Sequence, residues 1–264
     1  RQMCIRDRNV RRVELLCSVL SDLKNAGHEV VLVSSGAIGM GVGKLGLKER
    51  PKDTPGRQAA ACIGQCELMF MYDKFFSEYS NTIGQLLITK SDVENDERRN
   101  NLINAFNTMF EYGAIPIVNE NDSIAVEEIV FGDNDSLSAI VARLIHAEAL
   151  IILSDIDGLF DDNPNENPDA RLIPVVKEIN DEIKALCGGA GSNRGTGGMI
   201  TKIHAAEIAG EAGICSGCGI ATLSISYEEL GRTTGAMAVK ILKGEADIEE
   251  MAIEYDNKPV KKYN

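Results

Sequence analysis

Ile115-Pro116-Ile117-Val118-Asn119-Glu120-Asn121-Asp122 is the stretch that decides the expected fold. Its first four residues form an apolar run with the length of a short buried strand, and four polar residues follow at once. A turn alone requires only one or two Asx residues, so four consecutive polar residues favour a binding role. The stretch therefore predicts a strand that brings polar side chains to a ligand at its carboxyl end.

Apolar runs alternate with helical patterns through most of the chain. The strand-like runs are 29–33, 83–88, 115–118 and 149–153, and helical spacing is found in 10–23, after Gly36, in a long segment through Tyr72, in about 97–112, in 136–146 and in 199–208. Strands that alternate with helices are typical of a parallel sheet with helices on both faces. The sequence thus predicts an α/β fold, a three-layer αβα sandwich with a mostly parallel central sheet.

Polar clusters stand at the carboxyl ends of these strands. Ser34-Ser35-Gly36 follows the first strand, Asn119 to Asp122 the third and Ser154-Asp155 the last, while Gly132-Asp133-Asn134-Asp135 precedes a helix. Ligands of parallel sheets bind at the carboxyl ends of the strands, so the four clusters are expected to meet at one edge of the sheet. For Ser35, two interpretations stay open: a donor to a small anion, or a helix N-cap.

Gly195-Thr196-Gly197-Gly198-Met199-Ile200-Thr201-Lys202 joins a glycine cluster, a helix start and one lysine. Glycines expose backbone N–H groups, the helix N-terminus adds partial positive charge, and the lysine adds a mobile cation. The lysine does not directly follow the last glycine, so the stretch is not a Walker A loop. It predicts a phosphate-binding loop, although similar glycine clusters also occur as simple loop punctuation.

Metal and redox motifs are not evident. Asp133 and Asp135 flank Asn134 in the manner of an oxygen-rich cation site or of positioning carboxylates, but no EF-hand spacing follows. The three histidines form no metal or acid–base constellation, and Cys215-x-x-Cys218 lacks a second pair. The sequence therefore names no metal ligand.

Composition narrows the class of protein. The 264 residues are 44% hydrophobic and carry a formal net charge of −13, which argues against nonspecific nucleic-acid binding. No apolar run approaches the roughly 20 residues of a membrane span, and the first residues lack the apolar region of a secretory signal. Seven cysteines without framework spacing indicate reduced thiols. We expect a cytoplasmic protein of one large or two small domains.

In their order and spacing, the motifs from about Val10 to Gly213 closely resemble those of the glutamate 5-kinases, within the amino acid kinase family. They are Val33-Ser34-Ser35-Gly36-Ala37, Val118 to Asp122, Phe131 to Asp135 with Leu137-Ser138-Ala139, Leu153-Ser154-Asp155 with Gly158-Leu159, and Gly195 to Lys202. The resemblance implies transfer of the γ-phosphoryl group of ATP to the side-chain carboxylate of L-glutamate, giving glutamyl 5-phosphate, the first step of proline biosynthesis.

The resemblance also assigns residues to ligands. Glutamate would be bound by Ser35, Gly36, Asp122 and Asn134, and ATP by Ser154, Asp155, Thr196, Gly197, Gly198, Met199, Ile200, Thr201 and Lys202. Lys202 and Asp135 would be the catalytic pair: Lys202 stabilises phosphate charge, and Asp135 orients cationic groups. The resemblance implies ATP with Mg²⁺ and a homo-oligomer, and no nucleic-acid or membrane partner is expected.

Both ends of the chain depart from the family pattern. Members begin with an apolar strand carrying Lys-x-Gly-[ST], which residues 1–8 lack, so we expect a non-family leader and a missing first strand. Residues 9–213 are expected to form the kinase domain, and 214–264 an atypical tail. From about Ala221 the tail resembles the end of an ABC transporter substrate-binding protein. The chain is therefore interpreted as a composite, with a divergent kinase as the alternative.

Other functions stay open at this stage. A catalytically impaired domain would bind glutamate and nucleotide without turnover, and another amino acid kinase would phosphorylate aspartate, acetylglutamate or uridylate instead. The ordered pair Asn119 to Asp122 and Gly132 to Asp135 favours the glutamate 5-kinases.

Overall fold

A computed structural model describes residues 2–124, 133–154, 158–164, 166–187 and 198–214 of the chain. The chain divides into two compact units, Arg1–Leu137 and Ser138–Asn264, which are considered separately. All of the expected atypical tail except Ile214, residues 215–264, lies outside the described residues.

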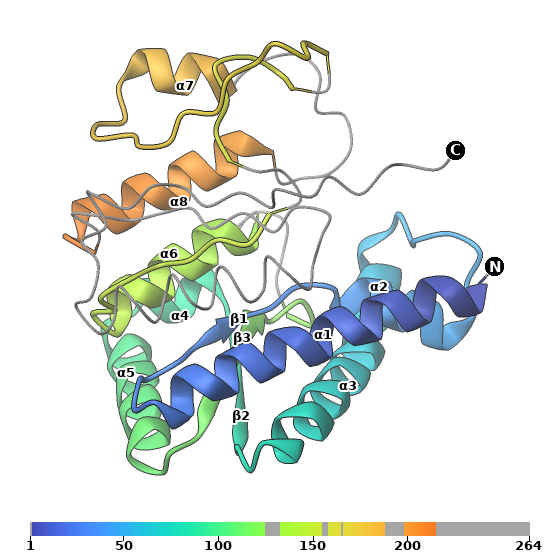
Figure 1. Cartoon of the computed structure of the whole chain (residues 1–264). Helices are drawn as coiled ribbons and strands as arrows, with labels where there is room; N and C mark the ends of the chain where they lie inside the picture. Colours follow the sequence, from blue (N-terminus) through green and yellow to red (C-terminus); the bar gives the residue numbers. More distant parts are fainter. Residues whose placement is uncertain (1, 125–132, 155–157, 165, 188–197, 215–264) are drawn as a thin grey trace. The chain divides into compact units, whose positions relative to one another are not determined.

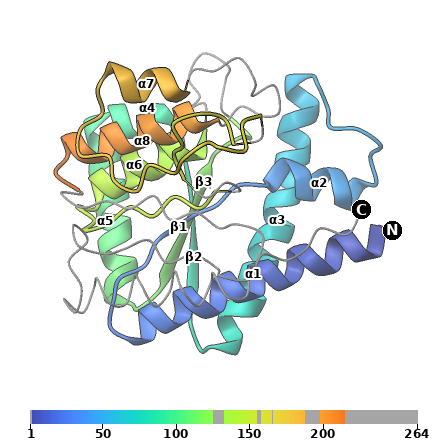
Figure 2. The same cartoon turned by 45° about the horizontal axis from the view of Figure 1, so that its top comes forward.

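The first unit is a parallel sheet between helices. Its elements are α1 (Gln2–Asn25), β1 (Leu32–Val33), α2 (Ala37–Leu45), α3 (Thr54–Glu78), β2 (Ile83–Ile88), α4 (Lys90–Glu94), α5 (Asp96–Glu111), β3 (Ile115–Glu120) and the start of α6 (Asn134–Leu144). The strand order is β1-β3-β2, and both pairings are parallel. In Figures 1 and 2, α5 lies on one side of the sheet, and α1 and α3 lie on the other. The predicted αβα layering and parallel sheet are confirmed.

The core of this unit lies between β3 and helices α1 and α3. Ile115 and Ile117 of β3 are 0% and 1% exposed and pack with Cys17 of α1 and Phe76 of α3. Burial raises the pKa of the Cys17 thiol to about 12, which fits a structural cysteine. Successive strand residues face opposite sides of a sheet, so the apolar residues of β3 serve both helix layers. This explains why the strand reads as one continuous apolar run.

Strand β1 is shorter than its apolar run because of Pro116 in β3. The Ser34 N–H donates to the Val118 carbonyl at 2.8 Å, so the polar backbone groups of residue 118 face β1. Residue 116, two positions earlier, faces the same way, but proline has no N–H to donate. Pairing with β1 accordingly begins at Leu32, opposite Ile117, and the predicted strand 29–33 is formed only at 32–33.

Helices α2 and α3 approach each other backbone to backbone at two glycines. A Cβ placed on Gly41 would overlap the backbone of Ala60, and one placed on Gly64 would overlap the Ala37 carbonyl and the Gly41 nitrogen. Only glycine permits so close a crossing. The crossing fixes the first turn of α2, which directly follows the polar stretch Ser34 to Gly36.

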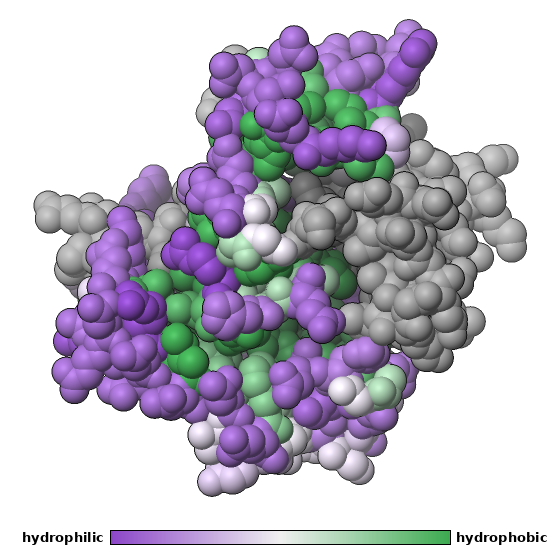
Figure 3. Space-filling model, turned by 90° about the vertical axis from the view of Figure 1, so that its left-hand side faces the viewer, coloured by the Kyte–Doolittle hydropathy of each residue, from purple (hydrophilic) through white to green (hydrophobic). Residues whose placement is uncertain are grey.

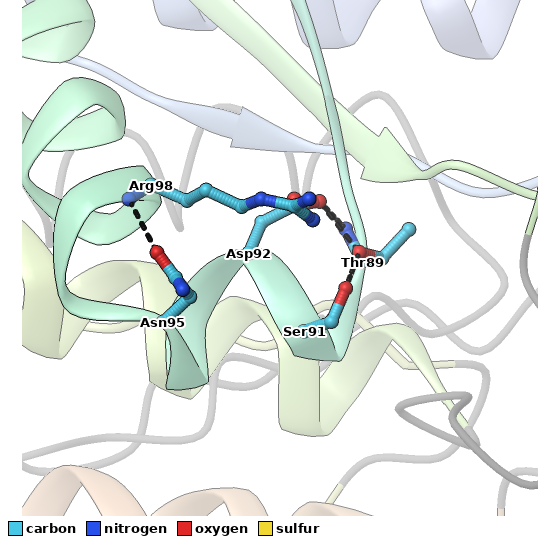
Figure 4. Close-up of polar contacts among 5 residues, drawn as sticks. All are labelled: Thr89, Ser91, Asp92, Asn95 and Arg98. Carbon is cyan, nitrogen blue, oxygen red and sulfur yellow. Dashed lines mark hydrogen bonds and ion pairs between the residues drawn. The ribbon is translucent and has the colours of Figure 1, made fainter.

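The turn after β2 is held by a polar cluster, shown in Figure 4. The Asp92 carboxylate accepts hydrogen bonds from the backbone N–H and the hydroxyl of Thr89, at 2.9 and 2.5 Å. Arg98 donates to the other carboxylate oxygen at 3.2 Å, and Asn95 caps α5 by accepting from the Arg98 N–H at 3.0 Å. The cluster thus joins the end of β2 to both helices of the next connection.

Replacing Asp92 is expected to destabilise the fold by about 1 kcal/mol at neutral pH. Burial alone would raise the pKa of Asp92, but hydrogen bonds from Thr89 and the charge of Arg98 outweigh it and lower that pKa below its ordinary 3.8. A lowered folded-state pKa gives stability that is complete above about 3.8 and is lost as the pH falls. Urea unfolding should therefore separate wild type from Asp92→Ala at neutral pH and much less near pH 3. Asp73→Ala, at an exposed position of α3, is the control and should have little effect.

The face of the first unit that carries α5 is polar. In Figure 3, which shows the side of the molecule where α5 lies, hydrophilic residues cover much of the surface. Asp96 is 85% exposed and Arg98 61% exposed. The sequence from Glu94 to Arg99 is a run of mostly charged residues, which is typical of a solvated helix start, and the exposure of these side chains agrees with that.

The second unit contains the rest of α6, α7 (Asp181–Cys187) and α8 (Met199–Glu211). Ala139 of α6, Ile152 and Ala205 of α8 form a buried cluster. The segment 149–153, predicted as a strand, forms no ladder with any described residue. Ile152 is buried, but Ile151 and Leu153 are 44% and 38% exposed. An apolar run supplies the side chains of a strand but not the partner that it needs.

Candidate functional site

The candidate site of the first unit lies where β1 and β3 end. The chain leaves β1 through Ser34 and Ser35 and turns at Gly36, whose φ of +104° is in the left-handed region that favours glycine. Gly36 is the N-cap of α2 and offers no side chain to the first-turn N–H groups, so the alternative of Ser35 as the N-cap is not realised. The Ser35 side chain is exposed beside this helix start.

Asn134 connects this turn to the end of β3. Its Nδ2 donates to the Ser34 carbonyl at 2.7 Å and to Asn119 Oδ1 at 3.2 Å. The three residues are separated by up to 100 positions in the sequence, yet all lie in the first unit. The expectation that the polar clusters meet is confirmed for Ser34, Asn119 and Asn134.

Two residues behind the site were not identified from the sequence. Gln65 of α3 accepts a hydrogen bond from Asn119 Nδ2 at 3.1 Å, and the Tyr72 hydroxyl lies 2.7 Å from Ser34 Oγ. Burial raises the pKa of Tyr72, so its hydroxyl stays protonated and can donate to Ser34. Gln65 and Tyr72 lie on the buried face of α3, whose sequence is typical of a helix that packs against a core. The only sign of their role in the sequence is that a glutamine stands among apolar core residues.

Asp122 stands near the end of β3 and is partly buried. Burial raises the pKa of its carboxyl, and the positive charges of Arg50 and Arg57 oppose this shift. Arg50 comes from the loop before α3, and Arg57 from the first turns of that helix. Sequence reasoning missed both arginines, which add positive charge near a site proposed for an anionic amino acid.

The two carboxylates beside Asn134, those of Asp133 and Asp135, have different surroundings. Asp133 caps α6, since its two oxygens accept from the backbone N–H and the hydroxyl of Ser136 at 2.7 and 3.1 Å. That capping role uses the oxygens that a cation site would need. Asp135 is half-buried in the first turn of α6, next to Asn134. Within the described residues, no group of three His, Cys, Asp or Glu side chains is placed to hold a metal ion.

The predicted phosphate loop belongs to the second unit. Gly198 is the N-cap of α8 with no side-chain cap, and Thr201 Oγ1 donates back to the Gly198 carbonyl at 2.8 Å. Helix α8 carries the predicted residues Met199, Ile200, Thr201 and the half-buried Lys202 in its first two turns, while Ser154 is half-buried after segment 149–153. Asp155, Thr196 and Gly197 lie outside the described residues. A helix start without a cap suits an anion, because its first N–H groups lack helical partners.

No helix within the described ranges is both long and apolar enough to cross a membrane.

Comparison with known proteins gives a consistent result. The sequence profile described as "Amino acid kinase family" matches residues 4–216. The chain is 54% identical over 210 residues to a glutamate 5-kinase of Clostridium perfringens, covering 78% of each chain. It is 57% identical over 206 residues to a glutamate 5-kinase of Clostridium acetobutylicum, covering 78% of this chain and 77% of the relative.

Solved structures agree on the fold. The product complex of isopentenyl phosphate kinase from T. acidophilum matches with a TM-score of 0.53 and 17% sequence identity, over 86% of each chain. At that identity the match concerns the fold alone. Because the family profile covers most of the sequence and relatives exceed 50% identity, the chain belongs to the amino acid kinase family.

Proposed function

We propose that this chain transfers the γ-phosphoryl group of ATP to the side-chain carboxylate of L-glutamate, forming glutamyl 5-phosphate for proline biosynthesis. The observation that carries the proposal is the 54–57% identity to glutamate 5-kinases over 78% of the chain. The meeting of Ser34, Asn119 and Asn134 at the strand ends supports it. No observation favours an aspartate, acetylglutamate or uridylate kinase.

The glutamate site is assigned to the first unit. Ser35 and Gly36 would present the start of α2 to a carboxylate, because uncapped N–H groups and the helix dipole favour an anion. Asp122 and the carboxamide of Asn134 would receive the ammonium group. Asp135 would orient cationic groups near the transferring phosphate, since a carboxylate nucleophile is already ionised and needs no general base.

The ATP site is assigned to the second unit. Ser154, Asp155 and the loop from Thr196 to Lys202 would hold the nucleotide, with the first turn of α8 facing phosphate and Lys202 stabilising charge on the oxygens. Phosphoryl transfer mainly requires alignment and positive charge, which these groups provide. Mg²⁺ would neutralise phosphate charge and is expected to be held largely by phosphates and water. We further propose a cytoplasmic homo-oligomer with no nucleic-acid or membrane partner.

The direct test is glutamate-dependent formation of ADP from MgATP by the whole chain. Turnover with glutamate and not with aspartate supports the proposal. Calorimetric titration with each ligand provides the second measurement. If both ligands bind but no ADP forms, the chain is a catalytically impaired binding domain and not an active kinase.

Binding of glutamate should depend on the ionisation of Asp122. Its pKa is raised by burial, so the carboxylate is lost at a higher pH than for an ordinary Asp, and KM for glutamate should rise as the pH falls through that range. Asp122→Asn should raise KM by about tenfold or more and remove this dependence. Glutamate itself also titrates, so the pH profile of KM for the wild type is compared with the profile of Asp122→Asn, in which the Asp122 carboxyl is absent. Superimposable profiles for the two proteins would contradict the role of Asp122.

A further inference from the structure

Backbone groups fix the orientation of two carboxamides in the candidate site. The Glu120 N–H can only donate, so the group that faces it at 2.9 Å is the oxygen of Asn119. The Ser34 carbonyl can only accept, so the group that faces it at 2.7 Å is the nitrogen of Asn134. Neither amide can be reversed without opposing two donors or two acceptors.

This orientation leaves one atom of Asn134 for a ligand. Its Nδ2 has two hydrogens, which are directed at the Ser34 carbonyl and at Asn119 Oδ1. Its Oδ1 accepts no hydrogen bond from any side chain or backbone group within the described part of the chain. The side chain therefore offers an acceptor, which suits an ammonium group and not a carboxylate.

Gln65 completes the chain of hydrogen bonds. Asn119 is 4% exposed and Gln65 is 8% exposed, and Asn119 Nδ2 donates to Gln65 Oε1 at 3.1 Å. A buried NH2 group without an acceptor is costly. If Gln65 lost its oxygen, the Asn119 NH2 group would have to move toward another acceptor or toward water, because the Glu120 N–H prevents a reversal of the amide. That movement would draw Asn119 Oδ1 away from the NH2 of Asn134, which needs it as an acceptor.

We propose that Gln65 is a positioning residue, which acts through Asn119 to hold the Asn134 carboxamide with its oxygen directed at the ammonium group of the bound amino acid. The identity of that amino acid as glutamate rests on the function proposed above. The hydrogen-bond chain itself is a property of the protein without ligand. The two can therefore be tested separately.

The binding test uses the full chain and calorimetric titration with glutamate. Gln65→Met keeps the size of the side chain but removes the acceptor, and should weaken binding by about tenfold. Gln65→Glu keeps an acceptor oxygen and should restore binding to within about twofold of wild type. Gln85→Met is the matched control at an exposed position of β2, and should bind as wild type.

A double variant separates positioning from general damage. If Gln65 acts only through Asn134, Gln65→Met should have no further effect on binding in an Asn134→Ala background. Additive losses, or equal losses in Gln65→Met and Gln65→Glu, would overturn the proposal. Glutarate, which lacks the ammonium group, should bind Gln65→Met and wild type about equally.

A measurement without ligand keeps the two proposals apart. In ¹⁵N spectra of the free chain, Gln65→Met should shift the side-chain NH2 signals of Asn119 and Asn134, and Gln85→Met should leave them in place. Unshifted Asn134 signals would overturn the hydrogen-bond chain even where glutamate binds. If these signals shift but the protein does not bind glutamate, the hydrogen bonds that connect Gln65, Asn119 and Asn134 are supported and the proposed substrate is rejected.

Discussion

Lys202→Ala is expected to lower kcat by at least ~10²-fold, the scale for removing one group that stabilises transition-state charge. Lys202 is half-buried in the first two turns of α8. This helix begins directly after the glycine-rich stretch that ends at Gly198. In the transition state, charge spreads over the transferring phosphoryl oxygens, and a nearby ammonium stabilises it more than it stabilises the ground state. The loss should therefore fall mainly on kcat.

Steady-state kinetics with saturating glutamate and varied MgATP measure this effect. Lys44→Ala is the control: Lys44 is exposed in α2, where its ammonium pairs with Glu67 at 2.6 Å, and its loss should leave kcat nearly unchanged. If Lys202→Ala turned over at the wild-type rate, Lys202 would have no catalytic role.

Gly64→Ala should destabilise the first unit by about 3 kcal/mol or more. The added Cβ would meet three backbone atoms of α2, the Ala37 carbonyl carbon among them at 2.8 Å. Backbone cannot move aside as a flexible side chain can, so α2 must separate from α3. Ala37 directly follows Gly36, so the same movement should displace the Ser35–Gly36 turn and weaken glutamate binding.

Gly43→Ala is the matched control within α2. A Cβ at Gly43 meets nothing within 4 Å, so the substitution should add stability of about 0.5–1 kcal/mol through helix propensity. Urea unfolding followed by circular dichroism measures both variants. Equal midpoints for Gly64→Ala and Gly43→Ala would show that the helix crossing tolerates a methyl group.

The sequence was most informative where one local pattern determined one element. The apolar run at 83–88 predicted β2 with its observed bounds, and helical spacing in 10–23 predicted α1, which ends at Asn25 but begins earlier, at Gln2. The segment 149–153 has an equally apolar run but forms no ladder among the described residues. Strand formation depends on a partner elsewhere in the chain, which local composition does not specify.

The residues of the candidate site also divide into those that the sequence identified and those that it did not. The resemblance pointed to Asn134, and the structure places its amide nitrogen 2.7 Å from the Ser34 carbonyl. Gln65 could not be found in this way, because its bond to Asn119 spans 54 positions and its own neighbourhood reads as helix. Arg50 and Arg57 were missed for a related reason: charged residues in a loop and at a helix start usually face solvent.

The strand order β1-β3-β2 has a consequence for the order of folding during synthesis. β1 and β2 are made first, yet in the described sheet each pairs only with β3. Neither has its partner until the ribosome has released residues 115–120, so the emerging chain carries two unpaired strands for some time. The α2–α3 crossing joins neighbours in sequence and can form earlier, because closing a short loop costs less entropy. The helix pair that orders the Ser34–Gly36 turn can thus exist before the sheet on which that turn depends.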